Sequence, residues 1–136
     1  MSYLLDDRLA SSSHKIMDWS LSEVRLKDNA NFPWIILIPR VSPSVSEVFE
    51  LSENQQRLLS AEIIRASHAM KIFFQAEKIN IGILGNIVLQ LHIHVIARFK
   101  QDLCWPHSLW QENIPEKPYD VHDHEKLIKN LREQLA

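Results

Sequence analysis

The chain has 136 residues, 46% hydrophobic and 24% charged, which suits one globular domain with its own core. Its 15 Lys and Arg against 17 Asp and Glu give a formal net charge of -2, so polymeric nucleic acid is excluded as an expected partner. The single cysteine, Cys104, excludes an intrachain disulfide, and no signal peptide or long apolar run suggests a membrane. We expect one domain over residues 1–136, located in the cytoplasm.

The first quarter of the chain predicts two strands after a polar arm. Residues 1–22 show little periodicity and are interpreted as an arm with at most one helical turn. Residues 23–27 alternate apolar and charged side chains, as in a half-buried strand, whereas residues 34–38 form the continuous apolar run of a central strand. The segment 28–33 between them is rich in turn formers and predicts a loop.

The middle of the chain predicts one long helix followed by a strand and a turn. Ser52 and Gln55 have the spacing of a capping box, so a helix should begin at Glu53. Its apolar stripe consists of Leu59, Ile63, Ala66, Met70 and Phe73. Residues 79–83 then alternate as a strand does, and Gly85-Asn86 favours a reversal of the chain.

Leucines spaced four residues apart predict a terminal helix that begins near Asp123. Strands grouped around one long helix, without regular strand-helix alternation, indicate an α+β fold. We therefore expect an antiparallel sheet of about five strands, one long helix and a C-terminal helix.

The chemistry is concentrated in one short strand pattern. Gln90, His92 and His94 alternate with apolar residues, so all three should share one face of a strand, about 6.6 Å apart. One interpretation is an amphipathic strand whose solvent-exposed face contains histidines. Another is a zinc site built on His92 and His94, with a further ligand from His107, His122 or His124.

Residues 85–98, with the sequence GNIVLQLHIHVIAR, resemble the glycine-led turn and alternating histidine strand of the histidine-triad (HIT) family. The resemblance extends more loosely over residues 23–98, leaving 99–136 as a C-terminal segment, and is greatest to a bacterial diadenosine polyphosphate hydrolase-like branch. It implies a HIT-like fold, a homodimer, a purine nucleotide as the substrate and no metal or other cofactor.

The resemblance also implies a covalent mechanism on His92. In the family the central histidine attacks the α-phosphorus and forms a nucleotidyl-imidazole intermediate, while a backbone carbonyl holds its other ring nitrogen. Imidazole suits this role because an ordinary pKa of about 6.5 leaves it neutral at cytosolic pH. His94 matches the histidine that assists at the phosphate and leaving-group oxygens.

Further site residues follow from the same resemblance. Asn80 matches a polar residue near the phosphates, and Asp28 or Asn29 approximates the residue that holds the ribose hydroxyls. Ile87 stands where a hydroxyl-bearing residue is common, and Asn86 beside it could supply the missing hydrogen bond. The alternative for these amides and carboxylates is that they bind nearby backbone groups in turns or at strand ends.

Two departures from the family pattern keep a second function open. Gln90, at the first triad position, can form hydrogen bonds but cannot take a proton as histidine does. Together with Ile87 it favours a catalytically weak or inactive nucleotide-binding module. Trp34 directly follows Pro33, where the family has a small residue and a histidine, so an altered pocket is expected. A metal-dependent hydrolase is the third alternative.

Three features outside the motif carry expectations of their own. Arg98 is interpreted as a solvated strand end and not as a phosphate ligand. The segment 105–110, with two tryptophans, forms either a pocket wall or part of a core or subunit interface. Cys104 is interpreted as a buried small hydrophobe.

Overall fold

The structure is a computed structural model that describes residues 2–136, in which one five-stranded antiparallel sheet has the strand order β1-β2-β3-β5-β4. The strands are β1 Ser13–Asp18, β2 Ser22–Lys27, β3 Trp34–Pro39, β4 Lys78–Gly82 and β5 Ile93–Arg98. The helices are α1 Asp7–Ser11, α2 Glu53–Phe74 and α3 Val121–Leu135, and a 3-10 helix covers Val48–Glu50. The predicted antiparallel α+β fold is confirmed.

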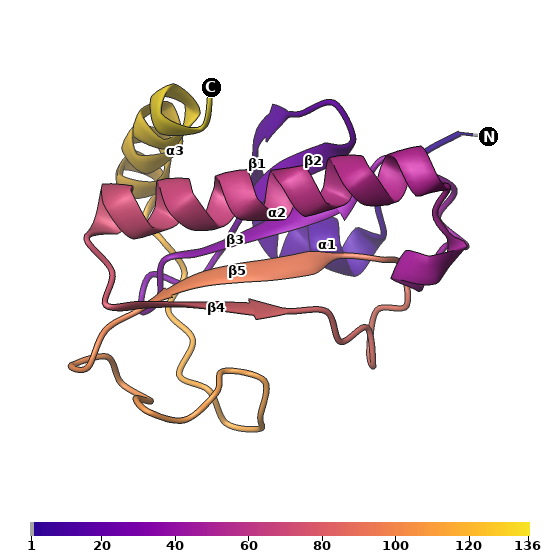
Figure 1. Ribbon diagram of the computed structural model, residues 1–136. Coiled ribbons are helices and arrows are strands. Elements are labelled where there is room, and N and C mark those ends of the chain that lie inside the picture. Colours follow the sequence, from indigo (N-terminus) through magenta and orange to yellow (C-terminus); the bar gives the residue numbers. More distant parts are fainter. Residues whose placement is uncertain (1) are drawn as a thin grey trace.

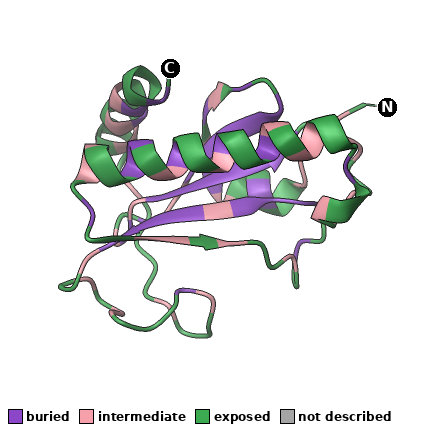
Figure 2. Ribbon diagram, in the orientation of Figure 1, coloured by how far each residue is buried: buried purple, intermediate pink, exposed green. Residues whose placement is uncertain are grey.

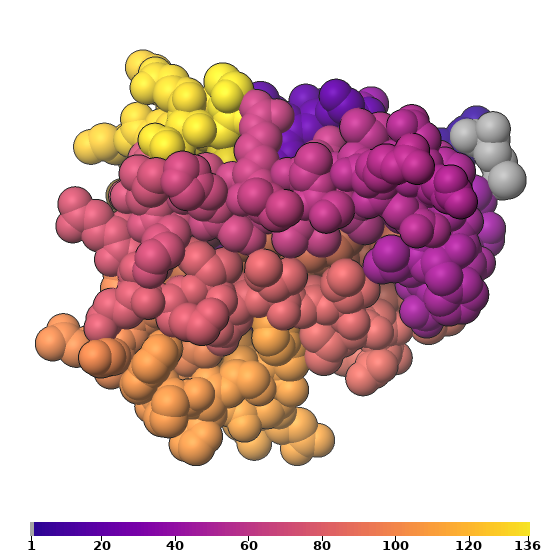
Figure 3. All heavy atoms as spheres, viewed as in Figure 1, coloured from indigo at the N-terminus to yellow at the C-terminus, as the bar shows by residue number. Residues whose placement is uncertain are grey.

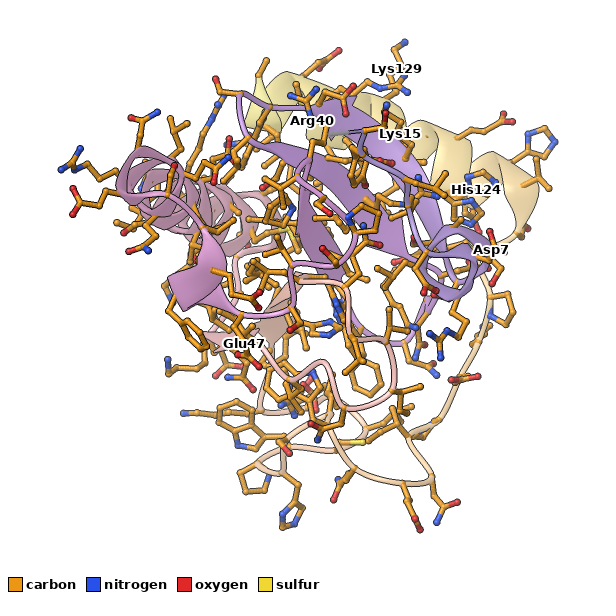
Figure 4. The ribbon with its side chains drawn as sticks, turned by 90° about the vertical axis from the view of Figure 1, so that its right-hand side faces the viewer. Asp7, Lys15, Arg40, Glu47, His124 and Lys129 are labelled. Atoms are coloured by element: carbon orange, nitrogen blue, oxygen red, sulfur yellow. The ribbon has the colours of Figure 1, made fainter. Side chains whose placement is uncertain are left out.

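Helices and loops cover both faces of the sheet. The long helix α2 crosses one face, with α3 beside it at the β1 end (Figure 1). After a turn of 90°, α2 and α1 lie on opposite sides of the sheet, with Asp7 marking the α1 side (Figure 4). In Figure 3 the orange segment after β5 forms a lobe at the lower left of the molecule. No helix within residues 2–136 is both long and apolar enough to span a membrane.

Each face of the sheet has its own apolar core. The core under α2 includes Leu26, Ile35, Leu37, Leu59 and Met70. The opposite core includes Leu9, Phe32, Trp34, Ile36 and Ile38. Because both faces of β3 are covered, its residues form the continuous apolar run seen in the sequence. β3 and β5 are buried along most of their length, whereas the edge strand β4 is largely open (Figure 2).

The capping box at the start of α2 is confirmed. The backbone N–H of Gln55 donates to Ser52 Oγ at 3.2 Å, and the backbone N–H of Ser52 donates to Gln55 Oε1 at 2.9 Å. Two otherwise unpaired backbone donors are therefore satisfied at the residue where the helix was expected to begin. The helix ends at Phe74, and the capping residue Gln75 adopts a left-handed conformation with φ of 54°.

The prediction for residues 1–22 misses the strand β1, whereas α1, with 5 residues, is little more than the one helical turn expected. Asp6 caps α1 by accepting from the backbone N–H of Arg8, and Ile16 of β1 is 1% exposed. The pairing of β1 with β2 shifts register between Lys15 and Met17. Such a bulge inserts an extra residue and interrupts the alternation by which a strand is recognised.

Two predicted boundaries also move. α3 begins at Val121, two residues before the predicted start, because the Asp120 carboxylate accepts from the backbone N–H groups of His122 and Asp123. β5 begins at Ile93, so Gln90 and His92 precede the paired strand. This placement leaves the carbonyl of residue 90 free to bind a side chain.

Candidate active site

His92 is held by the main chain two residues before it. Its side chain is buried, and its Nδ1 lies 2.7 Å from the carbonyl oxygen of Gln90. A carbonyl only accepts hydrogen bonds, so Nδ1 carries the proton and Nε2 keeps its lone pair. Burial, with the nearby charge of Lys27, lowers the pKa of His92 below its ordinary value. The imidazole is therefore neutral near pH 7, with Nε2 available as a nucleophile.

His94 is held in the opposite tautomer by a tryptophan. The indole Nε1–H of Trp34 donates to His94 Nδ1 at 3.0 Å. An indole N–H cannot accept, so the proton of neutral His94 lies on Nε2. Burial, followed by the effects of His92 and Lys27, lowers the pKa of His94 to about 3. His94 is therefore a neutral hydrogen-bond donor at neutral pH.

The lowered pKa of His94 predicts a specific dependence of stability on pH. Unfolded histidine has a pKa near 6.5, so between about pH 6.5 and pH 3 the unfolded chain binds protons more tightly than the folded one. The contribution of His94 to the free energy of unfolding is complete above this window. As the pH is lowered through this window, the contribution of His94 should fall by up to about 1.4 kcal/mol for each pH unit.

Urea unfolding at several pH values between about 7 and 5 measures this slope, and it avoids the range where carboxylates begin to titrate. The variant His94→Gln removes the titrating group and should show a shallower slope. His92, whose pKa is also lowered, retains its own contribution. Equal slopes in the wild type and the variant would contradict the burial argument.

The two imidazoles open onto a cavity of about 600 Å³. Their ring centroids are 4.9 Å apart. The cavity wall is formed by His92, His94, Arg8, Leu9, Ser12, Lys27, Ile36 and residues 84–88 and 109–112. Apolar side chains make up much of this wall, and the charge of Lys27 acts on both histidines. A small molecule with an apolar and an anionic part therefore suits the cavity.

Two cations on the cavity wall were missed in the sequence. Lys27 Nζ lies 5.7 Å from the ring centroid of Trp34, and no ion pair engages it within residues 2–136. Arg8 pairs with Asp6 at 3.2 Å and donates to the carbonyl of Ile87 at 3.1 Å. Neither residue belongs to a recognisable motif, because the fold alone brings β2 and α1 to the histidines.

Comparison with known proteins identifies the family. The model of the HIT domain matches residues 8–101, more than half of the chain. The chain belongs to the HIT domain family. Members of this family are generally nucleotide hydrolases or transferases. The comparison with curated proteins found no match.

Solved structures of HIT proteins agree with this membership. A histidine triad protein from Bradyrhizobium japonicum is 36% identical with a TM-score of 0.94, and the match covers 100% of both chains. One from Sinorhizobium meliloti is 37% identical with a TM-score of 0.92, covering 97% of this chain and 96% of the other. One from Marinobacter aquaeolei is 36% identical with a TM-score of 0.95, covering 99% and 97%. The HIT fold therefore extends over the whole chain.

The HIT motif brings only some of the predicted site residues to the cavity. Asn86 and Ile87 lie on its wall with His92 and His94. Gln90 does not line it: Gln90 Nε2 donates to the carbonyl of Leu4 at 3.0 Å, and Gln90 Oε1 accepts from the backbone N–H of Asp6 at 2.8 Å. Both ends of its amide therefore hold the N-terminal segment beside the triad.

Asn80 also lies outside the cavity wall, where it binds Arg98. The burial of Arg98 shows that its interpretation as a solvated strand end is wrong. Asn80 Oδ1 accepts from Arg98 Nη1 at 2.9 Å. Arg98 is 1% exposed, so it is not a solvated strand end. Asp102 accepts from Arg98 Nε at 2.7 Å and from its Nη2 at 3.1 Å, which compensates the buried charge. This ion pair could not be predicted from the sequence, because Asp102 follows the strand in an irregular loop.

Asp28 and Asn29 lie at a smaller adjoining cavity of about 190 Å³, which shares Ser12 and Lys27 with the main one. Asp28 Oδ1 accepts from the backbone N–H of Tyr119 at 2.9 Å. Asn29 is 2% exposed, and its Nδ2 donates to the carbonyl of Pro115 at 3.0 Å. Both side chains therefore hold the C-terminal segment against the loop that follows β2.

The end of the segment 105–110 forms part of the cavity wall, which is one of its two predicted roles. Trp110 lines the cavity, with its ring centroid 5.8 Å from that of His94. A Cβ at Gly82 would lie 2.6 Å from the Trp110 ring, so the glycine permits this packing. Trp105 lies instead beside Arg98, whose Cζ is 5.6 Å from the centroid of the Trp105 ring. Cys104 is half-buried against the core that faces α1.

The predicted zinc arrangement does not assemble. Within residues 2–136, no three His, Cys, Asp or Glu side chains gather in a way that could hold a metal ion. His124 stacks on His14 at a centroid distance of 4.1 Å.

Proposed function

We propose that this HIT protein is a nucleotide hydrolase or transferase that cleaves at the α-phosphate of a purine nucleoside phosphate through His92. The observation that carries the proposal is the bond from His92 Nδ1 to the Gln90 carbonyl. That bond fixes the tautomer in which Nε2, on the cavity side of the ring, has a lone pair. The substrate class is of the diadenosine polyphosphate or nucleoside phosphoramidate type.

The charged groups around His92 support this chemistry. Lys27 and Arg8 place positive charge on the cavity wall, where it can bind the phosphate oxygens. His94 can donate its Nε2–H to an oxygen on which negative charge develops. His92 Nε2 would attack the α-phosphorus, the bond to the leaving group would break, and water or another acceptor would then release the nucleotide.

A nucleotide-binding module without turnover is the second candidate. The observation that favours it is Gln90 itself, because its amide binds the backbone of the N-terminal segment and, unlike an imidazole, does not take up a proton. We also propose a cytoplasmic location for either function, which a single cysteine suits because disulfides are rare in that compartment.

Thermal unfolding and product analysis together test the proposed function. Adenosine monophosphate should raise the melting temperature, because it binds only the folded state, and Lys27→Met should weaken that shift. Diadenosine polyphosphate should also be hydrolysed. A melting shift without any product would leave the binding module as the function. No shift at millimolar ligand would contradict a nucleotide site.

We propose that the protein is a homodimer. The edge strand β4 leaves Ile81 exposed, and Ile83 and Leu84 continue the apolar edge. α2 adds exposed Ile64 and Ile72. Apolar edges of this kind are usually covered in solution. Light scattering should give twice the 15.9 kDa chain mass, and Ile81→Lys should shift the protein toward monomer. A monomer mass across micromolar concentrations would contradict the dimer.

A further inference from the structure

Trp34 controls the only ring nitrogen of His94 that could accept a proton. It is the first residue of β3 and is 6% exposed, so little water competes for the bond from its indole N–H to His94 Nδ1. The two rings meet edge to face at a centroid distance of 5.5 Å. His94 can become an imidazolium only if this bond breaks, because an indole N–H cannot accept a hydrogen bond.

The remaining triad groups do not supply a proton either. The Nδ1–H of His92 is donated to a carbonyl, and the amide of Gln90 is bound to the backbone of the N-terminal segment. The other charged residues on the cavity wall are Arg8, Lys27 and Glu112. The two cations contribute charge and hydrogen bonds to phosphate oxygens. The site is therefore rich in hydrogen-bond donors but lacks an imidazolium that could protonate a leaving group.

We propose that Trp34 is a positioning residue that holds His94 as a neutral hydrogen-bond donor, so that the site cleaves phosphoanhydrides in preference to phosphoramidates. This inference rests on the proposed attack by His92. An anhydride releases a phosphate anion, which departs without a proton. The amine released from a phosphoramidate is a much stronger base and has to be protonated as the bond breaks.

Each step balances without a proton from His94. The lone pair of His92 Nε2 forms a bond to the α-phosphorus, and the electron pair of the bridging P–O bond leaves with the remaining nucleoside polyphosphate, which is adenosine diphosphate for diadenosine triphosphate. Water then forms a bond to the α-phosphorus, and the P–N bond returns its electron pair to Nε2. The proton lost from water passes to solvent. His94 Nε2–H binds a phosphate oxygen in both steps.

Two measurements on the wild-type protein test the inference directly. Nitrogen-15 NMR of the His94 imidazole should show a single neutral tautomer, with the proton on Nε2, between about pH 5 and pH 8. The kcat/KM for diadenosine triphosphate should exceed that for adenosine phosphoramidate by roughly a hundredfold, the scale of general acid catalysis. An imidazolium at His94 near neutral pH, or a preference for the phosphoramidate, would overturn the inference.

The variant Trp34→Phe keeps an aromatic ring but removes the N–H. The NMR spectrum should then lose the single Nε2–H tautomer, because no donor holds Nδ1. The substrate preference should shrink by about tenfold as Nδ1 becomes able to accept a proton, although burial still opposes the imidazolium. Trp19→Phe is the matched control: it removes an indole bond to the Leu135 carbonyl, of 3.1 Å, in the core under α2. The control should keep the wild-type preference, and an equal change in both variants would contradict a specific role for Trp34.

Failure of the proposed function would look different. A protein inert toward both substrates would refute attack by His92, and with it the substrate preference, whereas the NMR spectrum would still decide the tautomer. A protein that cleaves both substrates equally well would retain the function and refute this inference. Circular dichroism verifies that each variant is folded before the rates are compared.

Discussion

Replacing His92 with alanine is expected to lower kcat at least about a thousandfold while nucleotide affinity changes little. The covalent step needs the imidazole Nε2, whereas Lys27 and Arg8 on the cavity wall can still bind the phosphates. Steady-state hydrolysis of a diadenosine polyphosphate gives the rate. Calorimetry with adenosine monophosphate gives the affinity of the same preparation.

An exposed histidine outside the cavity supplies the control for this substitution. His107 lies in the loop after β5, and His107→Ala should retain wild-type turnover. Wild-type rates in His92→Ala would refute the nucleophile. A parallel loss of binding and turnover would instead show that the substitution damaged the cavity as a whole.

Replacing Arg98 with alanine is expected to lower the free energy of unfolding by about 3–5 kcal/mol. The Asp102 side chain is 5% exposed, so the substitution leaves a carboxylate buried without its counter-charge. Asp102 also accepts from the backbone N–H groups of Cys104 and Trp105, at 3.1 and 2.7 Å. The start of the loop that carries Trp110 to the cavity should therefore loosen as well.

Urea unfolding of Arg98→Ala measures this loss, and a surface pair two residues away provides the comparison. Lys100 Nζ lies 3.8 Å from Glu77, and its side chain is 72% exposed. Lys100→Ala should therefore cost less than about 1 kcal/mol. Similar losses in the two variants would contradict the buried pair as the source of the stability.

The features that could be predicted from the sequence are those set by local periodicity. The capping box at Ser52 and the apolar run at residues 34–38 depend on neighbours in the chain, and the structure has both elements where they were expected. β1 was missed because its bulge breaks the alternation. Arg98 was misread because a charged residue at a strand end is usually solvated.

The parts of the site that escaped prediction depend on contacts between distant segments. Gln90 binds Leu4, 86 residues away, and Trp34 binds His94, 60 residues away. A single sequence records no such pairing, although Gln90 and Trp34 were both noticed as departures from the HIT pattern. Their side chains suit the contacts they make, since an amide both donates and accepts and an indole only donates.

The stereochemical course at the α-phosphorus tests attack by His92 most directly. A substrate made chiral there, with sulfur and an oxygen isotope, is cleaved by the wild-type protein, and the configuration of the product is determined. Attack by Nε2 followed by attack of water comprises two in-line displacements, so the account predicts overall retention of configuration. Inversion would mean that water attacks the phosphorus directly, and would contradict the nucleotidyl-His92 intermediate.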